Sequence, residues 1–424
     1  MENPKIRFKG FTKDWEQRRF GEITELKSAS RVHKDEWTSN GVPFYRSSDV
    51  MTAINGTENE KAFISEELYE KLSKVSGKLE EGDILVTGGG SVGNPYIVPD
   101  NKPLYTKDAD LLWIKNKGKF HPYFLYEFFF SPTFRNYLGS ISHVGTIAHY
   151  TITQLSDTPI GLPIFEEQKE VGEYFQSLDR LITLHQRKCD QTKNLKKYML
   201  QKMFPQNGAK VPEIRFDGYT YDWEQRKLGE LVKEGILEAP LDGNHGEKHP
   251  TSDEYVDSGI PFLMASDIHN GEVNIYSCKY ITKERAERLD KGFARNGDVL
   301  LTHKATIGET AILSNLMTEY AMLTPQVTYY RIKNEERLNR EYLYSFFNSL
   351  DFQTELKTKA AQSTRPYIGI TAQQNLKIIL PAEIDEQIRI GLYFRNLDHL
   401  ITLHQRKCDE LKKMKKYMLQ NMFI

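Results

Sequence analysis

Apolar residues recur with heptad spacing in two long stretches of the chain. The seam positions of the first stretch are Leu178, Ile182, His185, Cys189, Thr192, Met199 and Met203. Those of the second are Leu397, Ile401, His404, Cys408, Leu411, Met418 and Met422. Such spacing is typical of coiled-coil helices. Lys196 and Lys415 interrupt the seam, and polar interruptions of this kind indicate a specified register.

Both stretches carry signals for where a helix begins and ends. Pro163 and Pro381 stand at the start, where a missing N–H removes no helical hydrogen bond. The acidic residues of the first turns, which the helix dipole favours, are Glu166, Glu167, Asp385 and Glu386. Pro205 and Gly208 end the first helix. We therefore predict two helices of about forty residues, each about 60 Å long.

The two helices are near copies of each other. LDRLITLHQRKCDQTKNLKKYMLQKMF begins at Leu178 and LDHLITLHQRKCDELKKMKKYMLQNMF begins at Leu397, with roughly three quarters of the positions identical. A second pair, PKIRFKGFTKDWEQRRFGEI from Pro4 and PEIRFDGYTYDWEQRKLGEL from Pro212, matches at about two thirds of its positions. Because both pairs occur in the same order, the chain is an internal duplication.

Between these segments the halves diverge but keep a common skeleton. Its matched pieces are 41–44 and 259–262, 48–50 and 266–268, 82–87 and 297–302, and 125–129 and 343–347. The β-rich runs 83–87 and 298–302 predict strands. The aromatic runs 121–134 and 339–352 predict helices. Each half is expected to be a mixed α and β globular domain (α/β in the broad sense) with its own surface residues.

The predicted organisation alternates globular domains with helices. The first conserved segment and domain occupy 1–161, the first helix 162–206, the second segment and domain 207–379, and the second helix 380–424. The near-identity of the helices favours an intramolecular antiparallel coiled coil with internal pseudo-two-fold symmetry. In the alternative arrangements, each helix packs on its own domain or on another chain.

Composition narrows the class of protein. Lysine and arginine number 57 against 58 aspartate and glutamate, so any DNA-binding surface must gather positive charge locally. No apolar run approaches the roughly 20 residues that span a bilayer. Cys189, Cys278 and Cys408 show no paired spacing, which argues against disulfides or a zinc site and favours the cytoplasm.

These features together resemble the specificity subunit of Type I restriction-modification systems. The markers are the DWEQR segments at Asp14 and Asp222, the G-[IV]-P-F and G-D-[IV]-L strands, the LP…EQ helix entries and the LITLHQRK helices. The resemblance implies that each domain recognises one half of a split, asymmetric site in double-stranded DNA, and that the helices set the gap. It implies docking of two methylation subunits, which carry S-adenosylmethionine and methylate adenine N6, and of restriction subunits, which use ATP and Mg. The chain itself would bind no cofactor and catalyse no reaction.

Motifs for catalysis are weak in this sequence. The run Gly88–Gly93 matches G-x-G-x-x-G, but the residues after it are strand-like, whereas a dinucleotide or S-adenosylmethionine site needs a helix there. Asn94-Pro95-Tyr96 lacks the second proline of the amino-methyltransferase motif, and the sequence has no P-loop. Glu167 belongs to a helix entry that recurs at Glu386, so we interpret it as structural rather than as part of a nuclease carboxylate set.

Base recognition requires donors and acceptors at the groove edge, and phosphate contacts require Lys, Arg and hydroxyl groups. We expect these residues in loops that differ between the halves. The candidates in the first domain are Arg46, Ser47, Thr87, Ser91, Asn94, His143, Thr146 and His149. Those in the second are Lys248, Thr302, His303, Lys304, Thr306, Gln362, Ser363, Arg365 and Tyr367, of which Lys304 and Arg365 are the strongest.

Two other functions stay open at the level of sequence. A coiled-coil DNA-binding or scaffold protein without restriction partners would have similar helices but would not co-purify with a methylation subunit. A self-sufficient methyltransferase would need the cofactor motifs that are weak here, and its isolated chain would bind S-adenosylmethionine.

Overall fold

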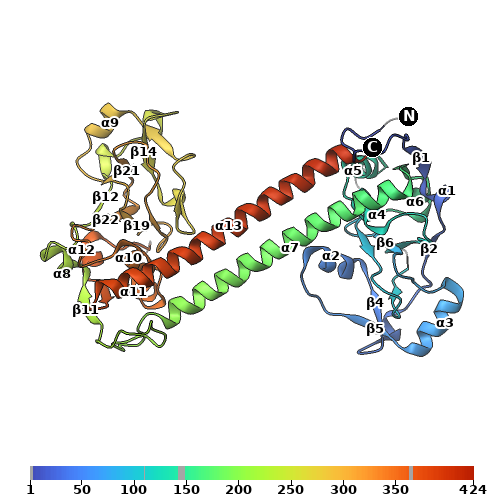
Figure 1. Cartoon of the computed structure of the whole chain (residues 1–424), viewed down its shortest axis with the longest axis horizontal. Coiled ribbons are helices and arrows are strands. Elements are labelled where there is room, and N and C mark those ends of the chain that lie inside the picture. Colours follow the sequence, from blue (N-terminus) through green and yellow to red (C-terminus); the bar gives the residue numbers. More distant parts are fainter. Residues whose placement is uncertain (1–2, 109, 142–148, 362–365) are drawn as a thin grey trace. The chain divides into compact units, whose positions relative to one another are not determined.

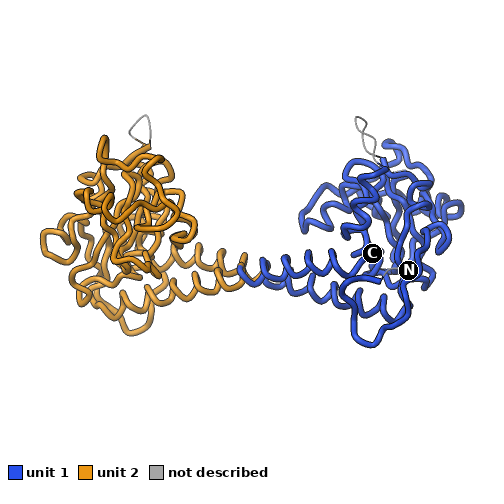
Figure 2. The backbone as a smooth tube through the Cα atoms, turned by 90° about the horizontal axis from the view of Figure 1, so that it is seen from above, with its two compact units in different colours: residues 1–186, 406–424 blue, residues 187–405 orange. Residues whose placement is uncertain are grey.

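The computed structural model describes residues 3–108, 110–141, 149–361 and 366–424. The chain forms two compact units, Met1–Gln186 with Arg406–Ile424 and Arg187–Gln405, which Figure 2 shows in different colours. The boundary passes through both long helices, α7 (Phe165–Lys202) and α13 (Ile384–Met422), labelled in Figure 1. Each unit therefore contains one globular part and a segment of each long helix.

The described part of the first unit contains three small sheets. One has the order β2 (Leu26–Ser28), β9 (Leu111–Ile114), β6 (Ile84–Thr87) and β7 (Pro95–Ile97). The next has the order β3 (Trp37–Thr38), β5 (Ala62–Ile64), β4 (Val42–Tyr45) and β8 (Tyr105–Thr106), and the third pairs β1 (Glu16–Arg19) with β10 (Pro159–Leu162). The helices before α7 are α1 (Phe20–Ile23), α2 (Ser47–Asn55), α3 (Glu66–Ser76), α4 (Pro122–Phe128), α5 (Pro132–Ile141) and α6 (Ile152–Asp157), with a 3-10 turn at Lys34–Glu36.

The second unit repeats this plan. One sheet has the order β12 (Leu241–Asp242), β22 (Val327–Tyr330), β19 (Val299–Thr302) and β20 (Thr310–Ile312). Another has the order β13 (Tyr255–Val256), β17 (Lys279–Ile281), β14 (Ile260–Leu263), β21 (Ala321–Leu323) and β18 (Phe293–Ala294). Two-stranded sheets pair β11 (Glu224–Lys227) with β23 (Lys377–Leu380), and β15 (Ile268–His269) with β16 (Glu272–Val273). The helices before α13 are α8 (Leu228–Lys233), α9 (Lys283–Glu287), α10 (Arg340–Phe347), α11 (Leu350–Ala360) and α12 (Ile370–Gln374), with 3-10 turns at Gly246–Lys248, Ser252–Glu254 and Ala265–Asp267.

The duplication and the mixed α and β fold predicted from the sequence are confirmed. The order β2-β9-β6-β7 in the first unit corresponds to β12-β22-β19-β20 in the second. In both units the DWEQR segment forms a strand antiparallel to the strand just before a long helix. Arg18 lies opposite Ile160, and Arg226 lies opposite Ile378. The repeated segment therefore fastens the start of each half to its end.

Each aromatic run that was expected to form one helix forms two. The chain breaks between α4 and α5 at Ser131, and between α10 and α11 at Ser349. The Ser131 hydroxyl accepts the Phe134 N–H at 3.3 Å, and the Ser349 hydroxyl accepts the Phe352 N–H at 3.4 Å. A serine that caps the backbone in this way starts a new helix. The spacing of aromatic residues does not reveal that local competition.

Aromatic side chains from the ends of the long helices complete each core. In the first unit, the ring centres of Phe423, just after α13, and Phe175, near the start of α7, lie 5.9 Å apart. In the second unit, Phe204, just after α7, lies 5.8 Å from Phe394, near the start of α13. All four rings are buried. Because burying such a ring contributes about 1.5–3 kcal/mol, each core depends on both long helices.

The long helices pair antiparallel in the second unit. The Cys189 sulfur lies 3.8 Å from the Ile401 carbonyl oxygen. Seven residues further along α7, Lys196 Nζ lies 2.5 Å from Asp398 Oδ1. The residue number rises along α7 while it falls along α13, so the two helices run in opposite directions.

The equivalent contacts recur in the first unit. The Cys408 sulfur lies 3.9 Å from the Ile182 carbonyl oxygen, and Lys415 Nζ lies 2.7 Å from Asp179 Oδ2. Cys408 and Lys415 occupy the positions that Cys189 and Lys196 occupy in the other copy of the helix. The antiparallel packing within the chain is thus present in each unit.

The lysines that interrupt the seam have aspartate partners on the opposite helix. The side chains of Lys196 and Lys415 are only 17% and 18% exposed, so a shift of register would leave each charge poorly solvated and unpaired. Among the other seam positions, Leu178, Cys189, Met203, Leu397, Cys408, Leu411 and Met422 are buried, and Ile182, His185, Thr192, Met199, Ile401, His404 and Met418 are half-buried. The lysine–aspartate pairs select one alignment of the helices.

A double-mutant cycle tests this role. Lys196→Met should lower the free energy of unfolding by about 1–3 kcal/mol, because it leaves Asp398 without its charged partner. Asp398→Asn removes that charge and keeps an oxygen for the Tyr344 hydroxyl, which lies 3.2 Å from Asp398. We therefore expect the double variant to be more stable than the Lys196→Met variant, as measured by urea denaturation. Simple addition of the two single losses would show that the pair is not coupled.

Candidate nucleic-acid interface

In each unit, the loop after the central strand, β6 or β19, meets a second segment with predicted DNA contacts at a β-bridge. The bridge joins Gly89 to His149 in the first unit and Lys304 to Tyr367 in the second. These are equivalent positions, since Gly89 and Lys304 are each the second residue after the strand threonine, Thr87 or Thr302. Stretches about sixty residues apart in sequence therefore form one loop cluster at the same place on each scaffold.

A buried threonine closes the first loop of each cluster. The Thr87 hydroxyl accepts the Asn94 N–H at 2.9 Å and donates to the Ser91 carbonyl. The Thr302 hydroxyl accepts the Glu309 N–H at 2.9 Å. Both threonine side chains are fully buried. They shape the loops and do not face solvent, in contrast to the direct DNA contact predicted for them from the sequence.

Other predicted residues are exposed at the loops. These are Ser91, His149, Lys304, Thr306 and Tyr367. Asn94 is half-buried, and its side-chain oxygen accepts a hydrogen bond from Arg135 at 3.0 Å. Lys248 is exposed and forms an ion pair with Asp290. The exposed residues among those predicted can contact a ligand without rearrangement of the loops.

Arg46 and Ser47 are occupied within the first unit. The Arg46 guanidinium donates to Asp49 at 2.9 Å and to the Glu60 carbonyl at 2.6 Å. The Ser47 hydroxyl donates to the Asp110 carbonyl at 3.0 Å. Both side chains therefore hold the start of α2 against the neighbouring loops. Five other predicted contacts, His143, Thr146, Gln362, Ser363 and Arg365, lie outside the described residues.

A buried polar network stands behind the second loop. His303 Nδ1 lies 3.0 Å from the Ile368 carbonyl oxygen, and burial lowers the pKa of His303 to about 4, so its ring is neutral at pH 7. Nearby, Asp242 Oδ2 lies 2.8 Å from His245 Nε2, and the same carboxylate pairs with Lys291. His303 is fully buried, so it braces the loop instead of reading DNA as predicted. Asp242 and His245 were not predicted, and their only signal is the polar run 242–245 where the halves diverge.

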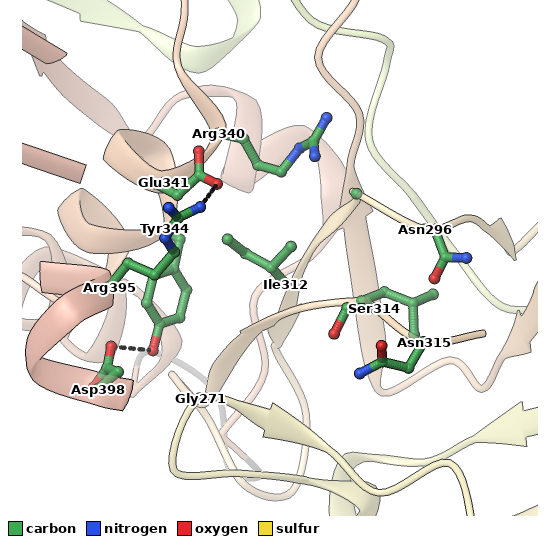
Figure 3. Close-up of a pocket in the computed structure, with 12 residues that line it drawn as sticks. Gly271, Asn296, Ile312, Ser314, Asn315, Arg340, Glu341, Tyr344, Arg395 and Asp398 are labelled. Atoms are coloured by element: carbon green, nitrogen blue, oxygen red, sulfur yellow. Dashed lines mark hydrogen bonds and ion pairs between the residues drawn. The ribbon is translucent and has the colours of Figure 1, made fainter. Parts of the chain in front are cut away.

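A pocket of about 500 Å³ lies in the second unit, where α10 and α13 meet β20 and the residues after it (Figure 3). Arg395 on α13 pairs with Glu341 on α10 at 3.2 Å. Tyr344 on α10 donates to Asp398 on α13 at 3.2 Å. Since these charged groups have partners inside the unit, the pocket marks the attachment of the long helix to its domain. It is distinct from the loop cluster.

Two motifs that were weighed as catalytic lie at the start of a strand and at the start of a helix. The glycine run 88–93 leads into strand β7 and not into a helix, as expected. Glu167 pairs with Arg7 at 2.6 Å, and Glu386 pairs with Arg215 at 2.7 Å, so the repeated helix entries anchor the repeated N-terminal segments. In the described ranges, no cluster of three or more His, Cys, Asp or Glu side chains could hold a metal ion. None of the helices described has the length and apolar character that a membrane span needs.

Both halves of the chain match one protein family. The family described as Type I restriction modification DNA specificity domain matches residues 12–194 and again residues 221–413. The Type I restriction enzyme MjaVIII specificity subunit of Methanocaldococcus jannaschii is 24% identical over 369 residues, covering 84% of this chain and 82% of the relative. The Type I restriction enzyme EcoBI specificity subunit of Escherichia coli is 24% identical over 284 residues, covering 62% of this chain and 56% of the relative.

Solved structures share the fold. The crystal structure of a Type I restriction-modification system S subunit from M. genitalium aligns with a TM-score of 0.65 at 14% identity, covering 100% of this chain and 99% of that chain. A chain from a structure that describes complex assembly and conformational transition of the type I R-M system aligns with a TM-score of 0.52 at 21% identity, covering 96% and 97%. Both likenesses extend over the two repeated domains and the long helices.

Proposed function

The chain belongs to the Type I restriction-modification DNA specificity family, and from this premise we propose that its two domains each recognise one half of a split, asymmetric site in double-stranded DNA. The long helices set the length of the unread gap. The chain docks two methylation subunits, which carry S-adenosylmethionine and methylate adenine N6. Restriction subunits, which use ATP and Mg, join the full complex, while the chain itself binds no cofactor and catalyses no reaction.

This proposal rests on one observation. The two units share the same backbone hydrogen bonds beside the loop clusters, while the side chains at those positions differ. The His303 N–H donates to the Gln326 carbonyl at 2.9 Å, and at the equivalent place the Gly88 N–H donates to the Asp110 carbonyl at 2.7 Å. The residue types at these matched positions differ completely. Phosphate contacts fix how a protein lies on DNA, and contacts to base edges select the sequence. One frame with two sets of side chains therefore suits two different half-sites approached in the same way.

Exposed apolar residues on the helices support the docking of partner proteins. In the first unit these are Leu181, Leu184, Met414 and Tyr417, and in the second they are Leu195, Tyr198, Leu400 and Leu403, all between 41 and 56% exposed. On each helix the four positions are separated by 3, 11 and 3 residues, which places them within about 100° of one another, beside the seam. An apolar stripe that the chain leaves uncovered is typical of a protein–protein contact.

Charge on this stripe should block assembly. Leu184→Glu combined with Leu403→Glu puts an acidic group at the same position of both helix copies, and burying an unpaired carboxylate in an interface is costly. We expect co-purification with the methylation subunit to fall at least tenfold. Lys197→Glu with Lys416→Glu, which adds more negative charge on the opposite side of the helices, is the matched control and should leave assembly intact. Retained assembly in the leucine variant would remove the stripe from the docking surface, and no assembly by the wild-type chain would favour the scaffold alternative.

Helix length should set the gap between the half-sites. Deleting the matched heptads 183–189 and 402–408 keeps the seam in phase and removes about 10 Å from each helix, which is about three base pairs of DNA. Mapping N6-methyladenine in cells that express the chain with its methylation subunits should show a split motif for the wild type. The deletion should change only the gap of that motif. Lys197→Ala with Lys416→Ala changes the helix surface without changing its length, and should leave the motif unchanged. A deletion that altered a half-site instead of the gap would contradict the spacer role.

A further inference from the structure

A pocket of about 390 Å³ lies beside the Lys304 loop in the second unit. Its volume is at the small end of the range for ligand sites, which suits a single chemical group more than an extended ligand. Residues that line it include His245, Met264, Lys304, Thr324 and Gln326. Except for Lys304, none of these was predicted from the sequence as a DNA contact. They come from segments far apart in the chain.

Three side chains of this pocket can donate hydrogen bonds into it. Thr324 is only 3% exposed, and its hydroxyl has no partner among the described residues. The Gln326 side-chain oxygen accepts the Ala265 N–H at 3.4 Å, which leaves the Gln326 amide NH₂ to donate. Lys304 is exposed and adds an ammonium group. A buried hydroxyl without a partner carries a free-energy cost that a bound acceptor would relieve.

We propose that this pocket is a specificity determinant for the second half-site, in which Lys304, Gln326 and Thr324 donate to the edge of one guanine. Guanine presents two acceptors in the major groove, O6 and N7, whereas every other base presents fewer acceptors there. The inference rests on the proposed function of the chain in DNA recognition. It adds which side chains select a base and which base they select.

The pocket is held in place before any ligand arrives. Lys304 is fixed by its bridge to Tyr367, and the neighbouring His303 is fixed through Nδ1, 3.0 Å from the Ile368 carbonyl oxygen. Because His303 is neutral, it does not repel the Lys304 ammonium. A loop fixed in this way loses little conformational freedom on binding, which favours specific recognition.

The matched positions of the first unit argue for base recognition over a phosphate contact. The counterparts of Lys304, Thr324 and Gln326 there are Gly89, Lys107 and Asp110. Lys107 and Asp110 form an ion pair at 2.5 Å, so those charges are satisfied within the first unit. The DNA backbone is the same at both half-sites, and a phosphate contact would call for similar residues in both copies. The two copies instead differ at every one of these positions.

Two variants test the assignment in the complex of the full chain with its methylation subunits. Lys304→Met removes the ammonium group from an exposed loop position, and Thr324→Val removes the buried hydroxyl with little change of shape. Binding to duplexes randomised across the second half-site should show that each variant weakens the preference for one G·C pair about tenfold. The first half-site should stay unchanged. Lys283→Met on α9, which does not line the pocket, is the matched control and should leave both preferences intact.

Other outcomes would overturn the inference. A uniform loss of affinity over all sequences, with a weaker dependence on salt, would identify a phosphate contact. Unchanged preference in both variants would show that the pocket does not contact a base. Wild-type binding without any sequence preference would instead contradict the proposed function itself, so the two failures are distinguishable.

Discussion

The antiparallel register of α7 and α13 is the constraint on which the rest of each unit depends. Lys196 pairs with Asp398 in one unit, and Lys415 pairs with Asp179 in the other. Half-buried ion pairs add little net stability, but an alignment that leaves the lysines unpaired is costly. The same register brings Phe204 and Phe423 into the two cores. A shift by one heptad would therefore break the charged pairs and empty both aromatic sites together.

The residues that repeat between the halves are those that build this frame. The DWEQR strands close each domain, the glutamates at the helix entries bind Arg7 and Arg215, and the helix ends fill the cores. The residues that do not repeat include those of the loop clusters, where Lys304 and Tyr367 replace Gly89 and His149. Duplication thus supplies two copies of one support, and the residues of the loop clusters differ between the copies while the support is kept.

Local patterns in the sequence predict much of this structure. Heptad spacing and near-identity give the long helices and their pairing, and the β-rich runs at 83–87 and 298–302 give the central strands β6 and β19. Patterns of this kind do not show which loop residues are buried. Thr87, Thr302 and His303 are polar residues in divergent loops, yet each is fully enclosed and supports the loop from within. Whether such side chains are buried depends on the β-bridge to a distant segment, and no local sequence pattern encodes that bridge.

The pocket beside Lys304 escapes sequence reasoning for the same reason. Thr324 and Gln326 follow the buried strand β21 and belong to no sequence motif. Met264 lies between strand β14 and the 3-10 turn Ala265–Asp267. They become neighbours only because β14 and β21 pair in parallel, with Phe262 opposite Met322 and Leu263 opposite Leu323. Side chains that gather through sheet register are visible only once the register is known.

We propose that each domain recognises its own half-site, and that the DWEQR strands and paired long helices support either domain equally. The most direct measurement is the N6-methyladenine motif produced by a chain in which residues 212–379 are replaced by a second copy of residues 4–161, expressed with the methylation subunits. The predicted motif consists of two copies of the first half-site in inverted orientation, separated by the wild-type gap. Persistence of the original second half-site, or a continuous motif without a gap, would contradict the claim.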